Sequence, residues 1–271
     1  AGTDLELDRR IGQLRSAGGD VMVSFGGQAN DELAVTCTDA DDLTDAYRDM
    51  VERYDLAAID LDIEGAALAD QAATGRRAEA VAALQRERAA EGTPLAVWLT
   101  LPVAPDGLTG EAVEVVRATL AGGVELTGVN VMTMNYGAAR AASQSMSAAT
   151  EQALRATAAQ VEDIYEEHGT DLGGDRTWGR IGATPMIGVN DVDGEVFTLA
   201  DAEALAGFAR DTGLGRMSLW SLNRDTACSA SFANVAVLSN TCSGVEQEPL
   251  AFVQVFAELG DGPAARVSDV V

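Results

Sequence analysis

The 271-residue sequence has no lysine, one histidine, three cysteines and six prolines. Its 18 basic residues, all arginine, stand against 43 acidic residues, which gives a formal charge of −25 at pH 7. A surface this acidic repels phosphate groups, so we expect no nucleic-acid partner. No stretch approaches the roughly 20 consecutive apolar residues that a membrane-spanning helix needs, so we expect no membrane partner either. Apolar runs nevertheless recur along the chain, which argues against intrinsic disorder.

Neither a G-x-G-x-x-G motif nor a P-loop follows any apolar run, which argues against a nucleotide-binding open sheet. The runs are short and nearly continuous, as is typical of strands covered on both faces. We predict strands at residues 21–25, 56–63, 95–101, 126–134, 181–189 and 217–222. Stretches with helical spacing predict helices at 5–14, 42–54, 76–90, 110–120, 147–167, 199–212 and 247–259.

Strands that alternate with helices predict a parallel sheet built of βα units. Two architectures fit this pattern, an open doubly wound sheet and a closed (β/α)8 barrel. Polar residues follow the predicted strands, where barrels carry their active sites, so we favour an α/β fold of the TIM-barrel type. Because six strands fall short of eight, we expect residues 1–259 to form a barrel that lacks its first one or two βα units. Residues 260–271 are expected to form a tail or linker.

Two of the three cysteines, Cys228 and Cys242, enclose a short segment rich in serine and asparagine. This pattern predicts a disulfide that closes a surface loop, with two unpaired thiols as the alternative. Such a loop would stabilise the fold by about 3 kcal/mol in the chain-entropy model. Disulfides persist in oxidising compartments, so we expect a secreted protein. Cys37 is left without a partner.

The most informative segment is LAAIDLDIE at residues 56–64, in which Asp60, Asp62 and Glu64 alternate with aliphatic residues. Residues two apart in a strand share a face, so the three carboxylates are expected to line up. Crowding raises the pKa of at least one of them, which leaves a group that is protonated near neutral pH and can act as an acid. A divalent-cation site and a solvated edge strand are the alternatives. No histidine accompanies the aspartates, because His168 lies in a Glu-rich helix end and is expected to be exposed.

This segment resembles the DxxDxDxE signature of glycoside hydrolase family 18, which contains chitinases and related endo-N-acetylglucosaminidases. Three further segments are similar to family elements in the same chain order: SFGG at 24–27, VMTMNYG at 131–137 and MSLWS at 217–221. The resemblance covers residues 5–259 and is greatest to single-domain bacterial chitinases of the actinomycete type. Two positions depart from the family pattern, because Ala57 replaces the first Asp of the signature and Asn135 stands where Asp is common.

The resemblance implies a glycosidase that cleaves β-1,4-linked N-acetylglucosamine polymers such as chitin by a substrate-assisted, retaining mechanism. Glu64 would be the acid, Asp62 would hold the acetamide N–H of the sugar and Asp60 would tune Asp62. Tyr136 would hydrogen-bond the acetamide oxygen. The expected substrate-binding residues are Trp220, Ser24, Gly26, Gln28, Met132, Asn135, Asn190 and Asp191.

No long insertion separates Val189 from Leu199, so the cleft is expected to be shallow and to favour internal cuts. Two alternatives remain open. One is an endo-β-N-acetylglucosaminidase acting on N-glycans or peptidoglycan glycans, and the other is a non-catalytic chitin-binding lectin, which the intact Glu64 argues against. We expect a monomer that binds chitin or N-acetylglucosamine oligosaccharides, with no cofactor and no metal.

Overall fold

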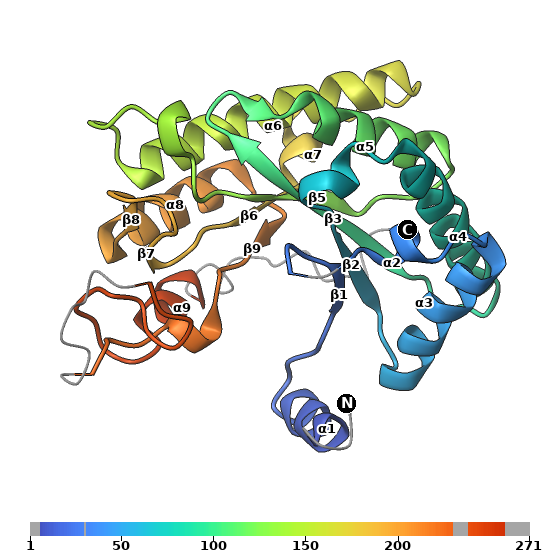
Figure 1. The fold of residues 1–271 in the computed structure, drawn as a ribbon, viewed down its shortest axis with the longest axis horizontal. Helices are drawn as coiled ribbons and strands as arrows, with labels where there is room; N and C mark the ends of the chain where they lie inside the picture. Colours follow the sequence, from blue (N-terminus) through green and yellow to red (C-terminus); the bar gives the residue numbers. More distant parts are fainter. Residues whose placement is uncertain (1–5, 30, 230–237, 258–271) are drawn as a thin grey trace. The chain divides into compact units, whose positions relative to one another are not determined.

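The computed structural model of the chain describes residues 6–29, 31–229 and 238–257 (Figure 1). The predicted tail at 260–271 and the last two residues of the helix predicted at 247–259 lie outside the described residues. The chain divides into two compact units. The first comprises Ala1–Thr100 and Glu114–Thr127, and the second comprises Leu101–Val113 and Gly128–Val271. No helix in the described ranges is both long enough and apolar enough to cross a membrane.

The first unit is built on three parallel strands. They are β1 (Val23–Gly26), β2 (Ala58–Asp62) and β3 (Ala96–Ala104), and they pair in this order. The helices of this unit are α1 (Leu7–Ser16), α2 (Leu33–Thr36), α3 (Ala40–Tyr54), the 3-10 helix η1 (Gly65–Leu68), α4 (Gln71–Ala90) and most of α5 (Gly110–Ala121). Helices α3 and α4 lie side by side (Figure 1).

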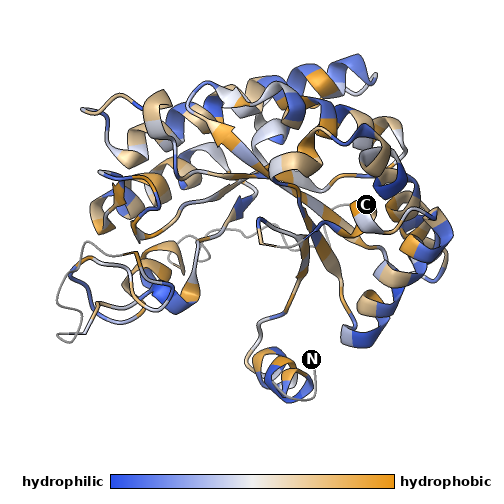
Figure 2. Cartoon of the chain, in the orientation of Figure 1, coloured by the Kyte–Doolittle hydropathy of each residue, from blue (hydrophilic) through white to orange (hydrophobic). Residues whose placement is uncertain are grey.

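Local sequence explains where the two long helices of this unit begin. The Asp39 carboxylate caps α3 by accepting hydrogen bonds from two backbone N–H groups of the first turn. Asp70 caps α4 in the same way, through the N–H of Ala73. Strands β2 and β3 are largely hydrophobic, whereas α3 and α4 also carry hydrophilic turns (Figure 2). The core of the unit therefore lies where these helices cover the sheet.

The second unit contains the parallel strands β5 (Gly128–Met132), β6 (Ile181–Thr184) and β9 (Arg216–Met217). Two antiparallel pairs accompany them: β4 (Gly107–Leu108) with the end of β3, and β7 (Gly188–Val189) with β8 (Val196–Phe197). Its helices are α6 (Met146–Glu167), α7 (Gly174–Trp178), α8 (Leu199–Thr212) and α9 (Ala251–Ala257), with the 3-10 helices η2 (Gly137–Ala139) and η3 (Leu222–Arg224).

The predicted alternation of strands and helices is confirmed, but two predicted strands are shorter than expected. The apolar run at 181–189 breaks into β6 and β7, because Pro185 has no N–H to continue a ladder. The run at 217–222 gives only the end of β9 and a single bridge between Met186 and Trp220. His168 ends α6 and is exposed, as predicted.

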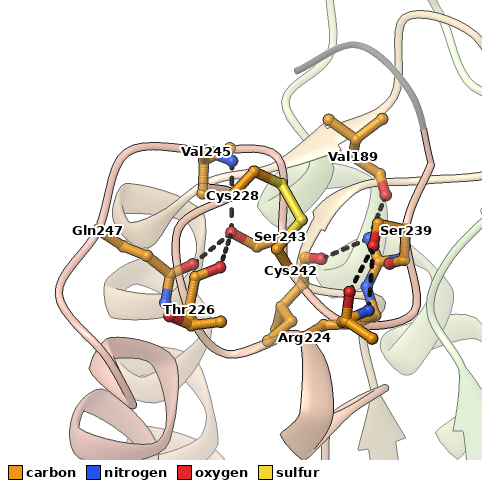
Figure 3. The surroundings of a disulfide bond; sticks show 11 residues. Val189, Arg224, Thr226, Cys228, Ser239, Cys242, Ser243, Val245 and Gln247 are labelled. Atoms are coloured by element: carbon orange, nitrogen blue, oxygen red, sulfur yellow. Dashed lines mark hydrogen bonds between the residues drawn. A yellow bond between two sulfur atoms is a disulfide. The ribbon is translucent and has the colours of Figure 1, made fainter. Parts of the chain in front are cut away.

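The predicted disulfide is present, with Cys228 and Cys242 joined at an S–S distance of 2.03 Å (Figure 3). The residues that flank the loop closed by this disulfide are bonded to the backbone of residues 187 and 189. The Val189 N–H donates to the Ser243 carbonyl at 2.8 Å, and the buried guanidinium of Arg224 donates to the Ile187 carbonyl at 3.1 Å. Cys37 carries a free thiol.

Candidate active site

The acidic segment lies on β2 and in the turn that follows it. Strand β2 pairs with β1 on one side and β3 on the other, so it is not a solvated edge strand. Ile59, Leu61 and Ile63 are fully buried, while Asp62 and Glu64 are half-buried. Asp60 is 3% exposed, and the three carboxyl groups lie close enough for the charges of Glu64 and Asp60 to raise the pKa of Asp62, as expected of residues that share a face. Within the described ranges, no three His, Cys, Asp or Glu side chains are arranged to hold a metal ion.

Two hydroxyl groups hold the buried carboxylate of Asp60. Ser24 Oγ donates to Asp60 Oδ2 at 2.7 Å from β1, and Thr100 Oγ1 donates to Asp60 Oδ1 at 2.7 Å from β3. These bonds replace part of the hydration that the carboxylate loses in its buried position. Sequence reasoning found Ser24 but missed Thr100, whose only signal is a hydroxyl residue inside an apolar strand.

Asp62 and Glu64 share a hydrogen bond between their carboxyl groups. Burial, followed by the negative charges of Glu64 and Asp60, raises the pKa of Asp62 from 3.8 to about 7. Burial also raises the pKa of Glu64, while a backbone N–H of Gln28 and the hydrogen bond from Asp62 oppose that rise. With a pKa of about 7, Asp62 gains and loses its proton near neutral pH, next to Glu64. Asp62 Oδ1 is buried and has no hydrogen-bond partner in the described part of the chain.

The predicted SFGG segment brings the β1–α2 loop against the end of β2. The Gly27 N–H donates to the Asp62 carbonyl at 3.0 Å. Gly26 has φ +110°, and a Cβ atom there would lie 2.1 Å from the same carbonyl oxygen, so no other residue fits. This close approach places the Gln28 N–H at Glu64. Gln28 thus acts on the acidic pair through its backbone, and its side chain is exposed.

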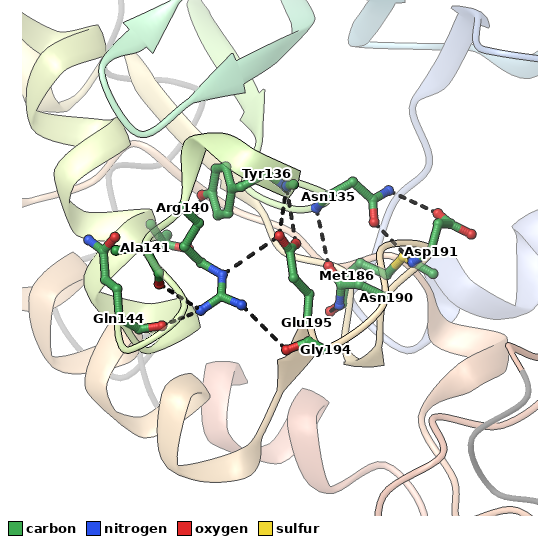
Figure 4. Close-up of polar contacts among 12 residues, drawn as sticks. Asn135, Tyr136, Arg140, Ala141, Gln144, Met186, Asn190, Asp191, Gly194 and Glu195 are labelled. Carbon is green, nitrogen blue, oxygen red and sulfur yellow. Dashed lines mark hydrogen bonds and ion pairs between the residues drawn. The ribbon is translucent and has the colours of Figure 1, made fainter.

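The remaining candidates belong to the second unit. Asn135 is exposed in the turn after β5, and its side chain forms two hydrogen bonds with Asp191 (Figure 4). Asn135 Nδ2 donates to Asp191 Oδ2 at 2.9 Å, and the Asp191 N–H donates to Asn135 Oδ1 at 3.0 Å. Met132, the last residue of β5, is half-buried. Asn135 and Asp191 thus bring together exposed polar groups from the turns after β5 and β7.

Two further candidates are largely buried. Tyr136 is 6% exposed, and its hydroxyl lies 3.3 Å from the hydroxyl of the fully buried Thr150. The bond from this hydroxyl to a substrate acetamide, which the resemblance implies, stays a prediction. Asn190 is 3% exposed, and its amide donates to the carbonyls of Met186 and Gly188. Its side chain therefore stabilises the β7–β8 hairpin, and a contact with substrate stays a prediction.

Trp220 is 53% exposed although its backbone is fixed on both sides. Its N–H donates to the Pro185 carbonyl at 2.9 Å, and its carbonyl accepts from the Ile187 N–H at 3.0 Å. A large indole ring in contact with solvent can serve as an apolar platform. This is the arrangement that a stacked sugar ring requires.

Two curated proteins share the sequence pattern of this chain. A protein of Escherichia coli K12 described as a probable bifunctional chitinase/lysozyme is 43% identical over 222 residues, which are 80% of this chain and 24% of that protein. Endochitinase 11 of Metarhizium anisopliae is 42% identical over 222 residues, which are 80% of this chain and 42% of that protein. The chain belongs to glycoside hydrolase family 18. It spans less than half the length of either relative, and no family model matches it.

Solved structures place the family 18 chain in a known fold. The catalytic domain of a hyperthermophilic chitinase from Pyrococcus furiosus matches with a TM-score of 0.80 and 29% identity, over 92% of this chain and 76% of that one. Catalytic-site mutants of active domain 2 of a Pyrococcus furiosus chitinase, complexed with chito-oligosaccharides, match with a TM-score of 0.79. The predicted α/β fold of the TIM-barrel type is thereby confirmed.

Proposed function

We propose that this family 18 chain is a glycosidase that cleaves β-1,4-linked N-acetylglucosamine polymers, chitin above all, at internal bonds. The observation that carries the proposal is the row of carboxyl groups along β2, in which Asp62 and Glu64 are half-buried with raised pKa values beside the buried Asp60. A general acid that works near neutral pH needs a raised pKa, and these carboxyl groups have one. The chitinase names of the two relatives and the chito-oligosaccharide complex of the Pyrococcus furiosus mutants support the substrate class.

The first step breaks the glycosidic bond. The acetamide N–H of the bound sugar donates to Asp62, which favours the ionised form of that carboxyl group and moves the shared proton to Glu64. Glu64 gives this proton to the glycosidic oxygen as the bond to the anomeric carbon breaks. The acetamide carbonyl oxygen attacks the same carbon and forms an oxazolinium ion, so the substrate replaces a carboxylate nucleophile.

The second step restores the enzyme. The Glu64 carboxylate takes a proton from a water molecule whose oxygen attacks the anomeric carbon, and the oxazolinium ring opens with net retention of configuration. The ionised Asp62 offsets the positive charge of the intermediate. Asp60 remains an acceptor for Ser24 and Thr100, and its negative charge keeps the proton of Asp62 in place between turnovers.

Binding in this proposal uses a stacking surface and hydrogen bonds. Trp220 supplies the surface for an apolar face of the sugar, and Asn135 and Asp191 supply donors and acceptors for hydroxyl groups. The hairpin between Val189 and Leu199 is short, which supports an open cleft and internal cuts. The disulfide supports an oxidising, extracellular location.

The test is Glu64→Gln, with Glu91→Gln on the exposed end of α4 as the matched control. We expect Glu64→Gln to lower kcat on chito-oligosaccharides at least about 10³-fold, because the acid is removed while the side-chain shape is kept. Binding of the same oligosaccharides, measured by calorimetry, should persist. The control should keep the wild-type kcat. Unchanged turnover in Glu64→Gln would remove Glu64 as the acid.

Product analysis separates the substrate classes and the mode of attack. Chitin oligosaccharides, an N-glycosylated protein and peptidoglycan are offered to the same preparation, and released sugars are resolved by chromatography. Internal cleavage predicts products of several lengths at early times and a rapid fall in the viscosity of a soluble chitin derivative. Release of one short product from chain ends would contradict the endo mode. Release of N-glycans alone would contradict chitin as the substrate.

A further inference from the structure

Glu195 is a buried carboxylate that the proposed mechanism does not use. It lies in the turn between β7 and β8 and is 1% exposed. A carboxylate in such a place costs several kcal/mol unless hydrogen bonds and an opposite charge compensate for the lost water. Here Glu195 Oε2 accepts the Tyr136 N–H at 3.0 Å and Oε1 accepts the Gly137 N–H at 2.8 Å. Arg140 Nε lies 3.6 Å from Oε1 (Figure 4).

The backbone after β5 is shaped to hold this carboxylate. Tyr136 has φ −67° and ψ −25°, and Gly137 has φ +57°. Successive residues with right-handed and then left-handed backbone angles direct their N–H groups to one side and form a small anion-binding concavity. Glycine adopts the left-handed angle without steric cost. The side chain of Glu195 fills that concavity and thereby fixes the turn.

The turn carries a substrate candidate at its first position. Asn135 also has a positive φ of +54°, its N–H donates to Asn190 Oδ1 at 3.3 Å, and its side chain pairs with Asp191. Segment 135–137 is therefore bound to the β7–β8 hairpin at both ends, by Asn190 and Asp191 at one end and by Glu195 at the other. Removing the Glu195 bonds would free one end of the turn.

We infer that Glu195 is a positioning residue that, through the backbone of Tyr136 and Gly137, fixes Asn135 and Asp191 for contact with the hydroxyl and amide groups of an N-acetylhexosamine. The inference rests on the proposed function for its substrate. Tyr136 accordingly acts in the turn through its backbone N–H and its buried ring. The sequence does not point to Glu195, because this residue stands in a loop with no motif. The two residues that it binds are 58 and 59 positions away in the chain.

The test is Glu195→Gln, which keeps the side-chain length but replaces one acceptor oxygen by an NH₂ group that cannot accept an N–H. We expect kcat on chito-oligosaccharides to fall about 10-fold with KM changed less than about twofold. The reason is that misplaced binding groups lose more interaction energy with the transition state than with the ground state. Independently of activity, the Tyr136 and Gly137 amides should exchange with deuterium about tenfold faster than in the wild type.

A matched control separates positioning from general loss of stability. Asp225 is 2% exposed and also binds two successive backbone N–H groups, those of Phe252 and Val253 at 3.1 and 2.8 Å, at the start of α9. Asp225→Asn should lower the melting temperature while kcat and the exchange of the Tyr136 and Gly137 amides stay at wild-type values.

If Glu195→Gln does not fold, Gly137→Ala tests the same turn. No atom lies within 4 Å of the added methyl group, so this variant strains only the backbone, and kcat should again fall. Wild-type kcat and wild-type exchange in a folded Glu195→Gln would overturn the inference. A wild-type chain that cleaves no chito-oligosaccharide would instead contradict the proposed function, and faster exchange in Glu195→Gln would still support the positioning role.

Discussion

In the proposed mechanism, the raised pKa values of Asp62 and Glu64 set the pH range in which Glu64 can act as an acid. The last proton leaves the pair as the pH rises through about 7, the pKa of Asp62. We therefore expect kcat/KM of the wild type to fall above about pH 7. In Asp62→Asn, Glu64 is the carboxyl group of the pair that remains, and no negative charge stands at position 62. The proton of Glu64 should leave at a lower pH, so the alkaline limb should move down by about one unit or more.

The measurement is kcat/KM on a soluble chito-oligosaccharide between pH 4 and pH 9. The rate of Asp62→Asn at its own optimum should be about 10²-fold below that of the wild type, because the acetamide loses its charged partner. Asp55→Asn is the control, since Asp55 is exposed just before β2 and is not among the groups that shift the pKa of Asp62. An alkaline limb that stays in place in Asp62→Asn would show that another group sets it.

At this scale the sequence predicts residues that are related by short spacing and misses those related by long-range contact. Asp60, Asp62 and Glu64 are found because a strand repeats every two residues. Thr100 donates to Asp60 across 40 positions, and nothing in the sequence links the two. The family motif marks Tyr136 as a polar side chain after a strand, but only the packing of α6 shows that its hydroxyl is buried against Thr150.

Among the elements, β7 is bonded to residues that flank the disulfide loop. Cys228 and Cys242 are 14 positions apart, a loop whose closure is worth about 3 kcal/mol in the chain-entropy model. Replacing both by serine should lower the free energy of unfolding by about that amount, measured by urea denaturation under oxidising conditions. Because Ser243 and Arg224 bond the backbone of β7, the loss should also raise the amide exchange of Val189 (Figure 3).

Cys37→Ser provides the control for this prediction. Cys37 carries a free thiol, so its replacement should leave the free energy of unfolding within about 0.5 kcal/mol of the wild type. The serine pair and the wild type treated with a reductant should then unfold at the same urea concentration. A double variant as stable as the wild type would show that the hydrogen bonds of Ser243 and Arg224, and not the covalent link, hold this part of the chain.

The elements that the sequence predicts well are the long helices, because periodicity over many residues is hard to mistake. Helix α8 is predicted at its observed bounds, and its capping box of Thr198 and Asp201 explains the sharp start. Helix α4 begins five residues before the predicted Arg76, because the Asp70 cap precedes a stretch of alanines without an amphipathic pattern. Strands β7 and β8 have two residues each, too few for any period to show.

The net charge of the whole molecule is expected to affect its stability and not its binding of substrate. A chito-oligosaccharide is neutral, so the charge of −25 does not attract it, and we expect the charge to act on stability instead. Net charge far from zero opposes the compact state through self-repulsion. Folding shortens the mean distance between like charges. Dissolved salt screens the repulsion between these charges, with a screening length of about 10 Å at 0.1 M ionic strength. The folded state should therefore gain more from salt than the unfolded state.

We expect the melting temperature at pH 7 to rise by about 3 °C between 20 mM and 500 mM sodium chloride, equivalent to about 1 kcal/mol for a chain of this size. Near pH 4.1, the isoelectric point calculated from the sequence, the same salt step should have little effect, because positive and negative charges balance. Calorimetric scans at both pH values and both salt concentrations make the comparison. An equal rise of the melting temperature at pH 4.1 would show that salt acts on apolar burial. No rise of the melting temperature at pH 7 would show that the acidic residues are already paired or well separated on the surface.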